Sequence, residues 1–179
     1  MEFVQRFDDA VDSQLDKIRG NPVVDRAMYA ASEVADFSLL WHLIAAARGA
    51  LGGDKRVDEA FRLSAIMGLE SLLVNGIIKS IFKRQRPVTA TPRPHALRQP
   101  VTSSFPSGHA SAAFTAVTVI TATTSKRTRP LWYLLAGLVA SSRMYVKIHH
   151  ASDVVAGALV GIGLGRLARR LPRSFPFGK

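Results

Sequence analysis

Cysteine is absent from the 179 residues of the chain, which excludes disulfide bonds and metal sites built on thiolates. Acidic residues are scarce beside basic ones: 13 Asp and Glu stand against 24 Lys and Arg, giving a formal charge of +11. Such a charge suits nucleic acid, an anionic membrane surface or a phosphorylated substrate. The first residues lack a basic segment followed by an apolar run, so we expect no cleavable signal peptide. Strand-like alternation and internal repeats are also missing, which points to a helical protein.

The N-terminal segment 1–21 is expected to form one amphipathic helix. Its apolar residues recur at steps of three and four: Phe3, Val4, Phe7, Val11, Leu15 and Ile18. Gly20 and the pair Asn21-Pro22 end the pattern. The segment is too polar to span a bilayer, so it either packs on a bundle or lies at the membrane interface, and we predict the interfacial position.

Apolar blocks make the rest of the chain a predicted bundle of five further helices. They run over roughly 25–51, 58–82, 108–124, 130–147 and 153–171, and each is near the ~20 residues that a spanning helix needs. Polar residues interrupt them, so several faces are expected to look inward or to lie near the interfaces. The fold class is therefore all-α, an integral membrane bundle of about five spans over residues 22–171, followed by a basic tail at 172–179. Glycines at 157, 161 and 165 form a small-residue stripe that predicts close helix packing.

The longest irregular segment, 83–107, carries five prolines and five basic residues. Long loops in compact domains tend to be functional or disordered, and a solvated basic linker is the simplest interpretation of this one alone.

Three short motifs favour a functional loop. They are "KSIFKRQRP", with Lys79 and Arg86; "PSGH", with Ser107, Gly108 and His109; and "SRMYVKIHHASD", with Arg143, His149 and Asp153. Cations at helix ends can hold phosphate oxygens, and a helix N-terminus with a glycine can bind an anion through its backbone. Two histidines supply a nucleophile and a proton donor. If 149–153 is helical, the carboxylate shares a face with the nearer imidazole and orients it.

Each residue also has a simpler interpretation when it is taken alone. Lys79 and Arg86 resemble charges that flank a membrane span, Ser107 an N-cap, and Asp153 a first-turn acid. His149 alone would be a half-buried polar residue. If the helices alternate in direction, however, all three motifs fall at one end of the bundle, and this grouping favours a common site.

In order and spacing, Lys-x6-Arg-Pro, Pro-Ser-Gly-His and Ser-Arg-x5-His-x3-Asp resemble the signature motifs of the type 2 phosphatidic acid phosphatase (lipid phosphate phosphatase) superfamily. The resemblance covers Lys79 to Asp153 and implies an all-helical core shared with acid phosphatases and vanadium haloperoxidases. It implies hydrolysis through a phosphohistidine, without metal or other cofactor. His149 would be the nucleophile, Asp153 would orient it, and His109 would act as general acid and then base. The phosphoryl oxygens would be bound by Lys79, Arg86, Ser107, Gly108 and Arg143.

The resemblance also carries expectations about setting and substrate. The chain is similar to short bacterial membrane members, which implies a multi-pass protein of the bacterial inner (plasma) membrane with an external active site. The expected partners are the bilayer and a lipid phosphate, with polyprenyl-linked substrates such as decaprenylphosphoryl-5-phosphoribose or undecaprenyl diphosphate favoured. Phosphatidate and phosphatidylglycerophosphate stay open, as does the oligomeric state.

Two other function classes compete with this interpretation. A vanadium haloperoxidase shares the fold and most anion-binding residues but is usually larger and soluble. A non-enzymatic anion-binding membrane protein would use the charge without needing His149. Nucleic acid is not an expected partner, because the basic residues lie at helix ends without an aromatic-studded groove.

Overall fold

The computed structural model describes residues 2–89, 94, 95 and 97–171, and within these ranges it contains helices, turns and loops but no strand. The helices are α1 (Glu2–Asp16), α2 (Pro22–Val34), α3 (Leu39–Gly52), α4 (Asp54–Ser71), α5 (Lys79–Ile81), α6 (Gly108–Ile120), α7 (Arg129–Tyr145) and α8 (Ala151–Arg170). Short 3-10 turns lie at Asp36–Ser38 and Lys126–Thr128, and a π-helical segment, Leu72–Ile78, joins α4 to α5. The predicted tail at 172–179 falls outside the described residues.

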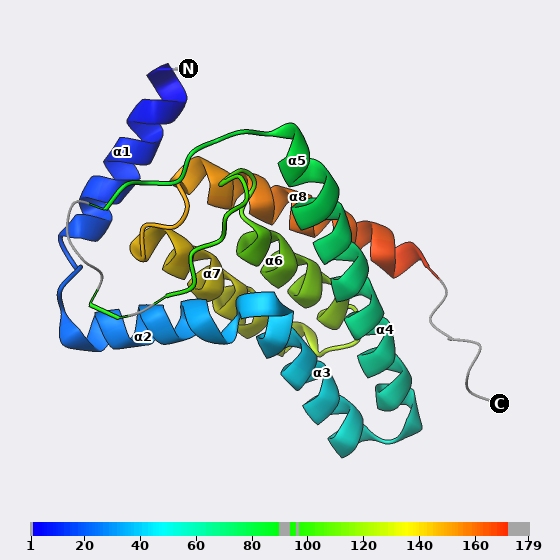
Figure 1. Cartoon of the computed structure of the whole chain (residues 1–179). Helices are drawn as coiled ribbons and strands as arrows, with labels where there is room; N and C mark the ends of the chain where they lie inside the picture. Colours follow the sequence, from blue (N-terminus) through cyan, green and yellow to red (C-terminus); the bar gives the residue numbers. More distant parts are fainter. Residues whose placement is uncertain (1, 90–93, 96, 172–179) are drawn as a thin grey trace.

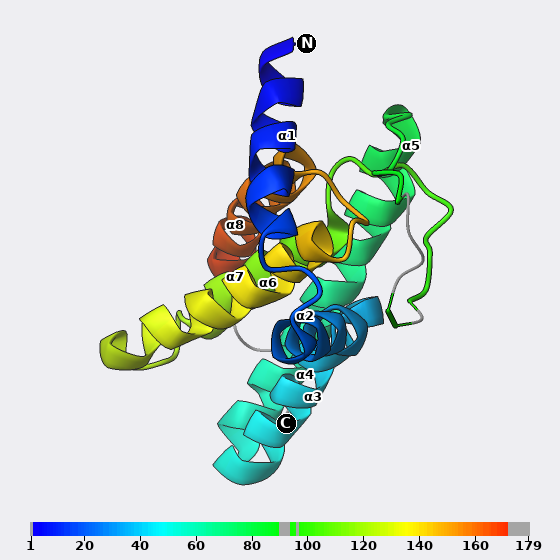
Figure 2. The same cartoon turned by 90° about the vertical axis from the view of Figure 1, so that its left-hand side faces the viewer.

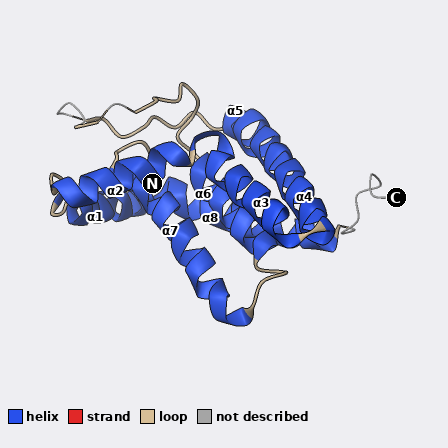
Figure 3. Ribbon diagram, turned by 90° about the horizontal axis from the view of Figure 1, so that it is seen from below, coloured by secondary structure: helices blue, strands red, loops and turns tan. Residues whose placement is uncertain are grey.

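Helix α6 forms the centre of the bundle (Figures 1 and 3). It packs against α8, α7 and α4, and nearly all of its side chains are buried. The glycine stripe explains the closest of these contacts. A Cβ atom on Gly161 would lie 2.3 Å from the carbonyl oxygen of Ser111, so the two helices meet backbone to backbone. Thr115 Oγ1 adds a hydrogen bond of 3.1 Å to the carbonyl of Gly161. The predicted packing role of the stripe agrees with this arrangement.

The helix expected over 25–51 is instead broken in two, and that prediction is wrong. Helices α2 and α3 bend by 63° across the 3-10 turn between them. Phe37 and Ser38 have φ values of 53° and 61°, a left-handed backbone that no α-helix continues through. The break turns this segment toward the N-terminal end of α6, as Figure 1 shows.

Helix α4 begins earlier than predicted, at Asp54, and runs through the π-helical segment into α5 as one apolar stretch, Asp54–Ile81. In the described part of the chain, this stretch and α8 are long and apolar enough to cross a membrane, and the bent pair α2–α3 makes up to three spans if it counts as one. Helix α6 is apolar but shorter. The number of five spans stays a prediction.

Helix α1 lies at the same end of the molecule as α5 in two perpendicular views (Figures 1 and 2). It ends at Asp16, earlier than predicted, and Asn21 then caps α2 by accepting hydrogen bonds from the amides of Val23 and Val24 at 3.0 and 3.3 Å. The helix contacts α7 and α8, with Asp8 buried and Leu15 packed against the cluster around Tyr145, while Phe3 stays 80% exposed. An apolar face that the bundle leaves uncovered is compatible with the predicted interfacial position, which stays a prediction.

Candidate active site

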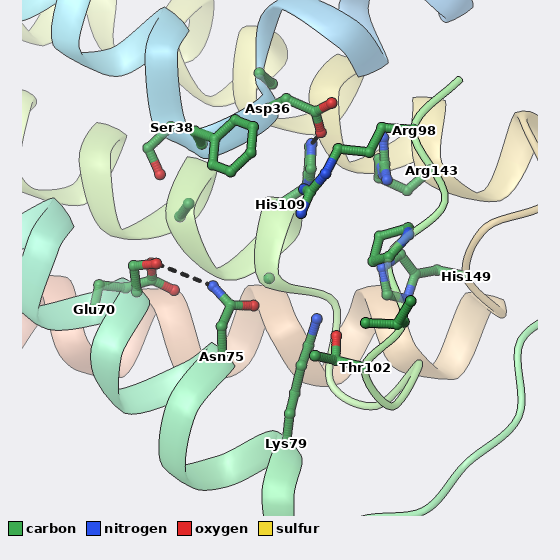
Figure 4. Close-up of a pocket in the computed structure, with 17 residues that line it drawn as sticks. Asp36, Ser38, Glu70, Asn75, Lys79, Arg98, Thr102, His109, Arg143 and His149 are labelled. Carbon is green, nitrogen blue, oxygen red and sulfur yellow. Dashed lines mark hydrogen bonds and ion pairs between the residues drawn. The ribbon is translucent and has the colours of Figure 1, made fainter. Parts of the chain in front are cut away.

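A cavity of about 240 Å³ lies at the end of the bundle where α6 begins (Figure 4). Its walls come from the break between α2 and α3, the α4–α5 stretch, the loop before α6, the first turn of α6 and the last turn of α7. Five of the predicted site residues line it: Lys79, Gly108, His109, Arg143 and His149. Residues from three distant motifs thus share one cavity, as the alternation of helix directions predicted.

His149 occupies the turn between α7 and α8, not a helix. Lys147, with φ at 52°, reverses the chain so that the His149 amide donates to the carbonyl of Arg143 at 3.1 Å. The condition for His149 and Asp153 to share a helical face is therefore not met, because α8 begins only at Ala151. They still approach one another: Nδ1 of His149 lies 3.6 Å from Oδ2 of Asp153, which also accepts a hydrogen bond from the His150 amide at 2.9 Å.

The surroundings of His149 favour a neutral imidazole. The side chain is 3% exposed, and its Nε2 lies 3.3 Å from Nη1 of Arg86. Burial lowers the pKa of His149 far below its usual value, the cations around it lower it further, and Asp153 acts in the opposite direction. The buried ring therefore keeps a lone pair at neutral pH, which is what a nucleophile needs.

Two arginines, the half-buried Arg86 and the buried Arg143, lie near this ring. Arg86 Nη1 donates to the carbonyl of Ile148 at 3.0 Å, and Nη2 donates to the carbonyl of Thr102 at 3.0 Å, so its guanidinium ties the long loop to the His149 turn. Arg143, 1% exposed, donates to the hydroxyl of Ser32 on α2. Lys79, in α5, is also buried. Burial of positive charge beside a cavity makes it a favourable place for a phosphoryl group.

Ser107 and Gly108 begin α6. Ser107 Oγ accepts from the amide of Ala110 at 3.4 Å, as an N-cap does, and the Ser107 amide donates to the carbonyl of Asp153 at 2.9 Å. A Cβ on Gly108 would lie 2.5 Å from Oδ1 of Asn75. The glycine is thus needed for the close approach of an amide side chain from the π-helical segment, in addition to any role toward an anion.

Sequence reasoning missed the partner of His109. Its Nε2 lies 2.9 Å from Oδ1 of Asp36, in the turn that breaks α2 from α3 (Figure 4). Burial lowers the pKa of His109 and the cations Arg143 and Lys79 lower it further, whereas Asp36 acts in the opposite direction and favours the protonated form that a general acid needs. The one available signal was an acidic residue inside a stretch predicted to span the membrane.

A second missed feature is an ion-pair relay behind Asp153, from the loop to α1. Arg84 Nη1 contacts Oδ1 of Asp153 at 2.7 Å, and Nη2 contacts Oδ2 of Asp8 at 2.6 Å. Asp8 also accepts from the amide of Ser152 at 2.7 Å. Arg84 lies inside the first motif, but at one of its variable positions, so the motif alone gives it no role.

The arrangement offers a neutral imidazole, a second imidazole with a carboxylate partner, and several buried cations. Such a set can transfer a phosphoryl group through covalent attack, with charge stabilised by the cations. Within the described residues, no group of three or more His, Asp or Glu is arranged to hold a metal ion.

Comparison with known proteins agrees with the motifs. The PAP2 superfamily model matches residues 59–175, well over half of the chain, so this protein belongs to the PAP2 superfamily. The family predicted from the three motifs is thereby confirmed.

The match to each curated relative covers only part of that relative. An undecaprenyl-diphosphatase of Sulfolobus acidocaldarius is 29% identical over 110 residues, 61% of this chain and 53% of that protein. The bacitracin transport permease protein BcrC of Bacillus licheniformis is 31% identical over 91 residues, 50% of this chain and 44% of that protein. The chain spans about half the length of these curated relatives.

Solved structures extend the likeness to almost the whole chain. A transmembrane PAP2-type phosphatidylglycerolphosphate phosphatase from Bacillus subtilis gives a TM-score of 0.70 at 24% identity, covering 94% of this chain and 86% of that chain. LpxE of Aquifex aeolicus gives 0.67 at 26% identity, covering 90% and 94%. The predicted fold class, an all-helical membrane protein of this superfamily, is confirmed.

Proposed function

We propose that the protein is a lipid phosphate phosphatase that forms a phosphohistidine on His149. The observation that carries the proposal is the buried, neutral His149, whose Nε2 lies 3.3 Å from a guanidinium nitrogen of Arg86 and whose Nδ1 faces Asp153. One ring nitrogen is thus next to a phosphate-binding cation, and the other is next to an orienting carboxylate. Membership of the PAP2 superfamily supports the same reaction.

In the proposed first step, Nε2 of His149 attacks phosphorus as the bond from phosphorus to the leaving oxygen breaks. His109, in the protonated form that Asp36 favours, gives its proton to that oxygen. In the second step, His109 removes a proton from water, the hydroxide attacks the phosphohistidine, and inorganic phosphate leaves with His149 restored. Five groups bind the phosphoryl oxygens and stabilise the charge spread over them in the transition state: Lys79, Arg86, Ser107, Gly108 and Arg143. No step requires a metal.

The favoured substrates are polyprenyl-linked, a monoester such as decaprenylphosphoryl-5-phosphoribose or a diphosphate such as undecaprenyl diphosphate. The relative from Sulfolobus supports the second class, because it is named an undecaprenyl-diphosphatase. The Bacillus structure brings phosphatidylglycerophosphate into the same comparison. We further propose that the site opens at the external face of a bacterial inner membrane.

The test is phosphate release by the purified protein in detergent with EDTA present, from these lipids and phosphatidate. His149→Ala should lower the turnover by at least about 1,000-fold, as loss of a covalent nucleophile does. His150→Ala is the matched control, since its neighbouring imidazole has no role in the proposed steps. A rapid acid-free quench should trap a base-stable phosphoenzyme in the wild type only. Activity that EDTA abolishes, or activity that survives in His149→Ala, would contradict the proposal.

A further inference from the structure

A second, smaller cavity lies at the end of the bundle opposite the candidate active site. The active-site cavity lies at Gly108, where α6 begins, whereas Val119 and Ile120, at the other end of α6, line the second one. Helix α6 has 13 residues, so about 20 Å separates the two places at the rise of an α-helix. The second cavity has a volume of about 30 Å³, enough for roughly two or three water-sized groups. Such a space suits one small oxyanion and is too small for a sugar.

The walls of this second cavity carry more positive than negative charge. Among the described residues that line it, three are arginines and one is a glutamate: Arg48, Arg56, Arg62 and Glu59. Oε2 of Glu59 lies 2.8 Å from Nη1 of Arg56 and 3.6 Å from Nη2 of Arg48. Thr123 Oγ1, beyond the end of α6, donates to the same carboxylate oxygen at 3.2 Å. Two guanidinium groups thus share one carboxylate, which leaves positive charge in excess beside the cavity.

Other contacts hold two of these guanidinium groups in place. Arg48 is half-buried and lies over the indole ring of Trp132, 5.8 Å from the ring centroid. Arg62 donates to the backbone carbonyls of Ala168 and Leu171, at the end of α8. A planar guanidinium that is already positioned loses little freedom when it binds phosphate oxygens, and it can bind two of them at once.

The cavity also lies where the candidate membrane spans end. Arg56 and Glu59 belong to the first two turns of the apolar stretch Asp54–Ile81, and Arg48 lies close to the end of α3. Lipid head groups surround the ends of spanning helices, and basic pockets between such helices bind the head groups of anionic lipids. The side chains of Arg56 and Glu59 are 34% and 36% exposed, so the rim of the cavity is open to a head group.

We propose that this cavity is a second anion site, which binds one phosphate group, either of an anionic lipid head group or of free phosphate. Arg48 and Arg56 donate to the phosphate oxygens, and Thr123 turns its hydroxyl to the same group. The carboxylate of Glu59 is the internal counter-ion of the empty site, and it swings outward when the phosphate takes its place. The inference does not depend on the proposed reaction, because none of these residues lines the active-site cavity.

Thermal unfolding of the full chain in a neutral detergent tests the site with two probes. Phosphatidylglycerol is compared with phosphatidylcholine, and inorganic phosphate with chloride at constant ionic strength. We expect at least one of the two anionic probes to raise the Tm of the wild type. In Arg48→Gln this rise should be smaller by about 3–6 °C, the change that a tenfold loss of affinity gives for a chain of this size. Probe bound at the candidate active site raises Tm in both proteins and cancels in the comparison.

Two further variants of the same end of the bundle complete the arginine test. Arg56→Gln, at the rim of the cavity, repeats it with a residue that is less buried, and its rise should shrink in the same way. Arg127→Gln is the matched control, because it removes an exposed positive charge from the turn before α7 and should keep the wild-type rise.

Glu59→Gln distinguishes an anion site from a cluster of internal ion pairs. The substitution removes the competing negative charge, so the rise in Tm at a subsaturating probe concentration should be larger than that of the wild type. A rise with phosphatidylglycerol alone assigns the phosphate group to a lipid, and a rise with inorganic phosphate assigns it to free phosphate. No rise with either probe, an equal rise in the wild type and both arginine variants, or a smaller rise in Glu59→Gln would overturn the proposal.

Discussion

Replacing Asp8 by Asn tests whether the N-terminal helix supports Asp153, the carboxylate proposed to orient His149. Asp8 is 5% exposed and accepts hydrogen bonds from Arg84, from the Ser152 amide and from the Ser152 hydroxyl at 2.6, 2.7 and 2.8 Å. The amide keeps one acceptor but turns an N–H toward the guanidinium of Arg84. Hydrogen bonds to charged groups contribute about 1.5–3 kcal/mol each, and Arg84 is partly solvated, so we expect a loss of about 2 kcal/mol in the free energy of unfolding.

For a chain of this size, such a loss lowers Tm by about 4–8 °C, which thermal unfolding in detergent can measure. Arg84 also holds Asp153, so release of its other end should loosen the orientation of His149 and lower kcat by about tenfold with little change in KM. Glu2→Gln is the matched control, because its ion pair with Arg6 on the same helix is exposed and contributes little.

A double-mutant cycle separates this relay from general destabilisation. In an Arg84→Ala background, Asp8→Asn should have almost no further effect on kcat, because its path to Asp153 is already cut. If Asp8→Asn lowers kcat equally in both backgrounds, or if it leaves Tm where Glu2→Gln leaves it, the relay argument is refuted.

Three further predictions concern the rest of the site and its support. Asp36→Asn removes the carboxylate that faces the proposed general acid, so hydrolysis of alkyl phosphates should fall by at least about tenfold. Hydrolysis of p-nitrophenyl phosphate, whose leaving group needs no proton, should change much less, and equal losses would contradict the assignment. Burial lowers the pKa of His149, so below pH ~6.5 this histidine binds a proton in the unfolded protein but not in the folded one. The stability of the fold should therefore decline as pH falls from ~6.5 toward about 3. His149→Ala should flatten this decline in denaturation curves, and an unaltered slope would show that other groups cause it. Gly161→Ala should lower Tm by several degrees, since its Cβ would meet a backbone oxygen at 2.3 Å, whereas Gly163→Ala, with open space around it, should not; equal Tm values for the two would refute the packing argument.

Helix ends were the most predictable part of the site. The N-cap at Ser107 and the first turn of α6 follow from ordinary capping chemistry, and the structure has both where the sequence predicts them. Lys79 and Arg143 lie in the last turns before loops, so alternating helix directions were enough to bring them together. The catalytic roles assigned to these residues stay predictions.

Apolar periodicity could not predict the backbone conformation of the turns that position the site. Three residues other than glycine adopt left-handed backbone φ and ψ angles: Phe37, Ser38 and Lys147. Their side chains do not predict this conformation. The first two break a predicted helix and bring Asp36 to His109, and the third shapes the turn that carries His149. Tertiary contacts, not local preference, fix both turns, so local sequence patterns do not predict them.

The broken α2–α3 segment and α1 also supply partners to charged and titratable side chains of the site. All eight motif residues lie between 79 and 153, but Asp8, Ser32 and Asp36 precede the family match at 59–175. These three accept from Arg84, contact Arg143 and face His109, respectively. A fragment that began at residue 59 would therefore keep every motif and still lack these three partners. In this protein, the signature marks the proposed reacting groups, while the segment before it supplies contacts to three side chains around them.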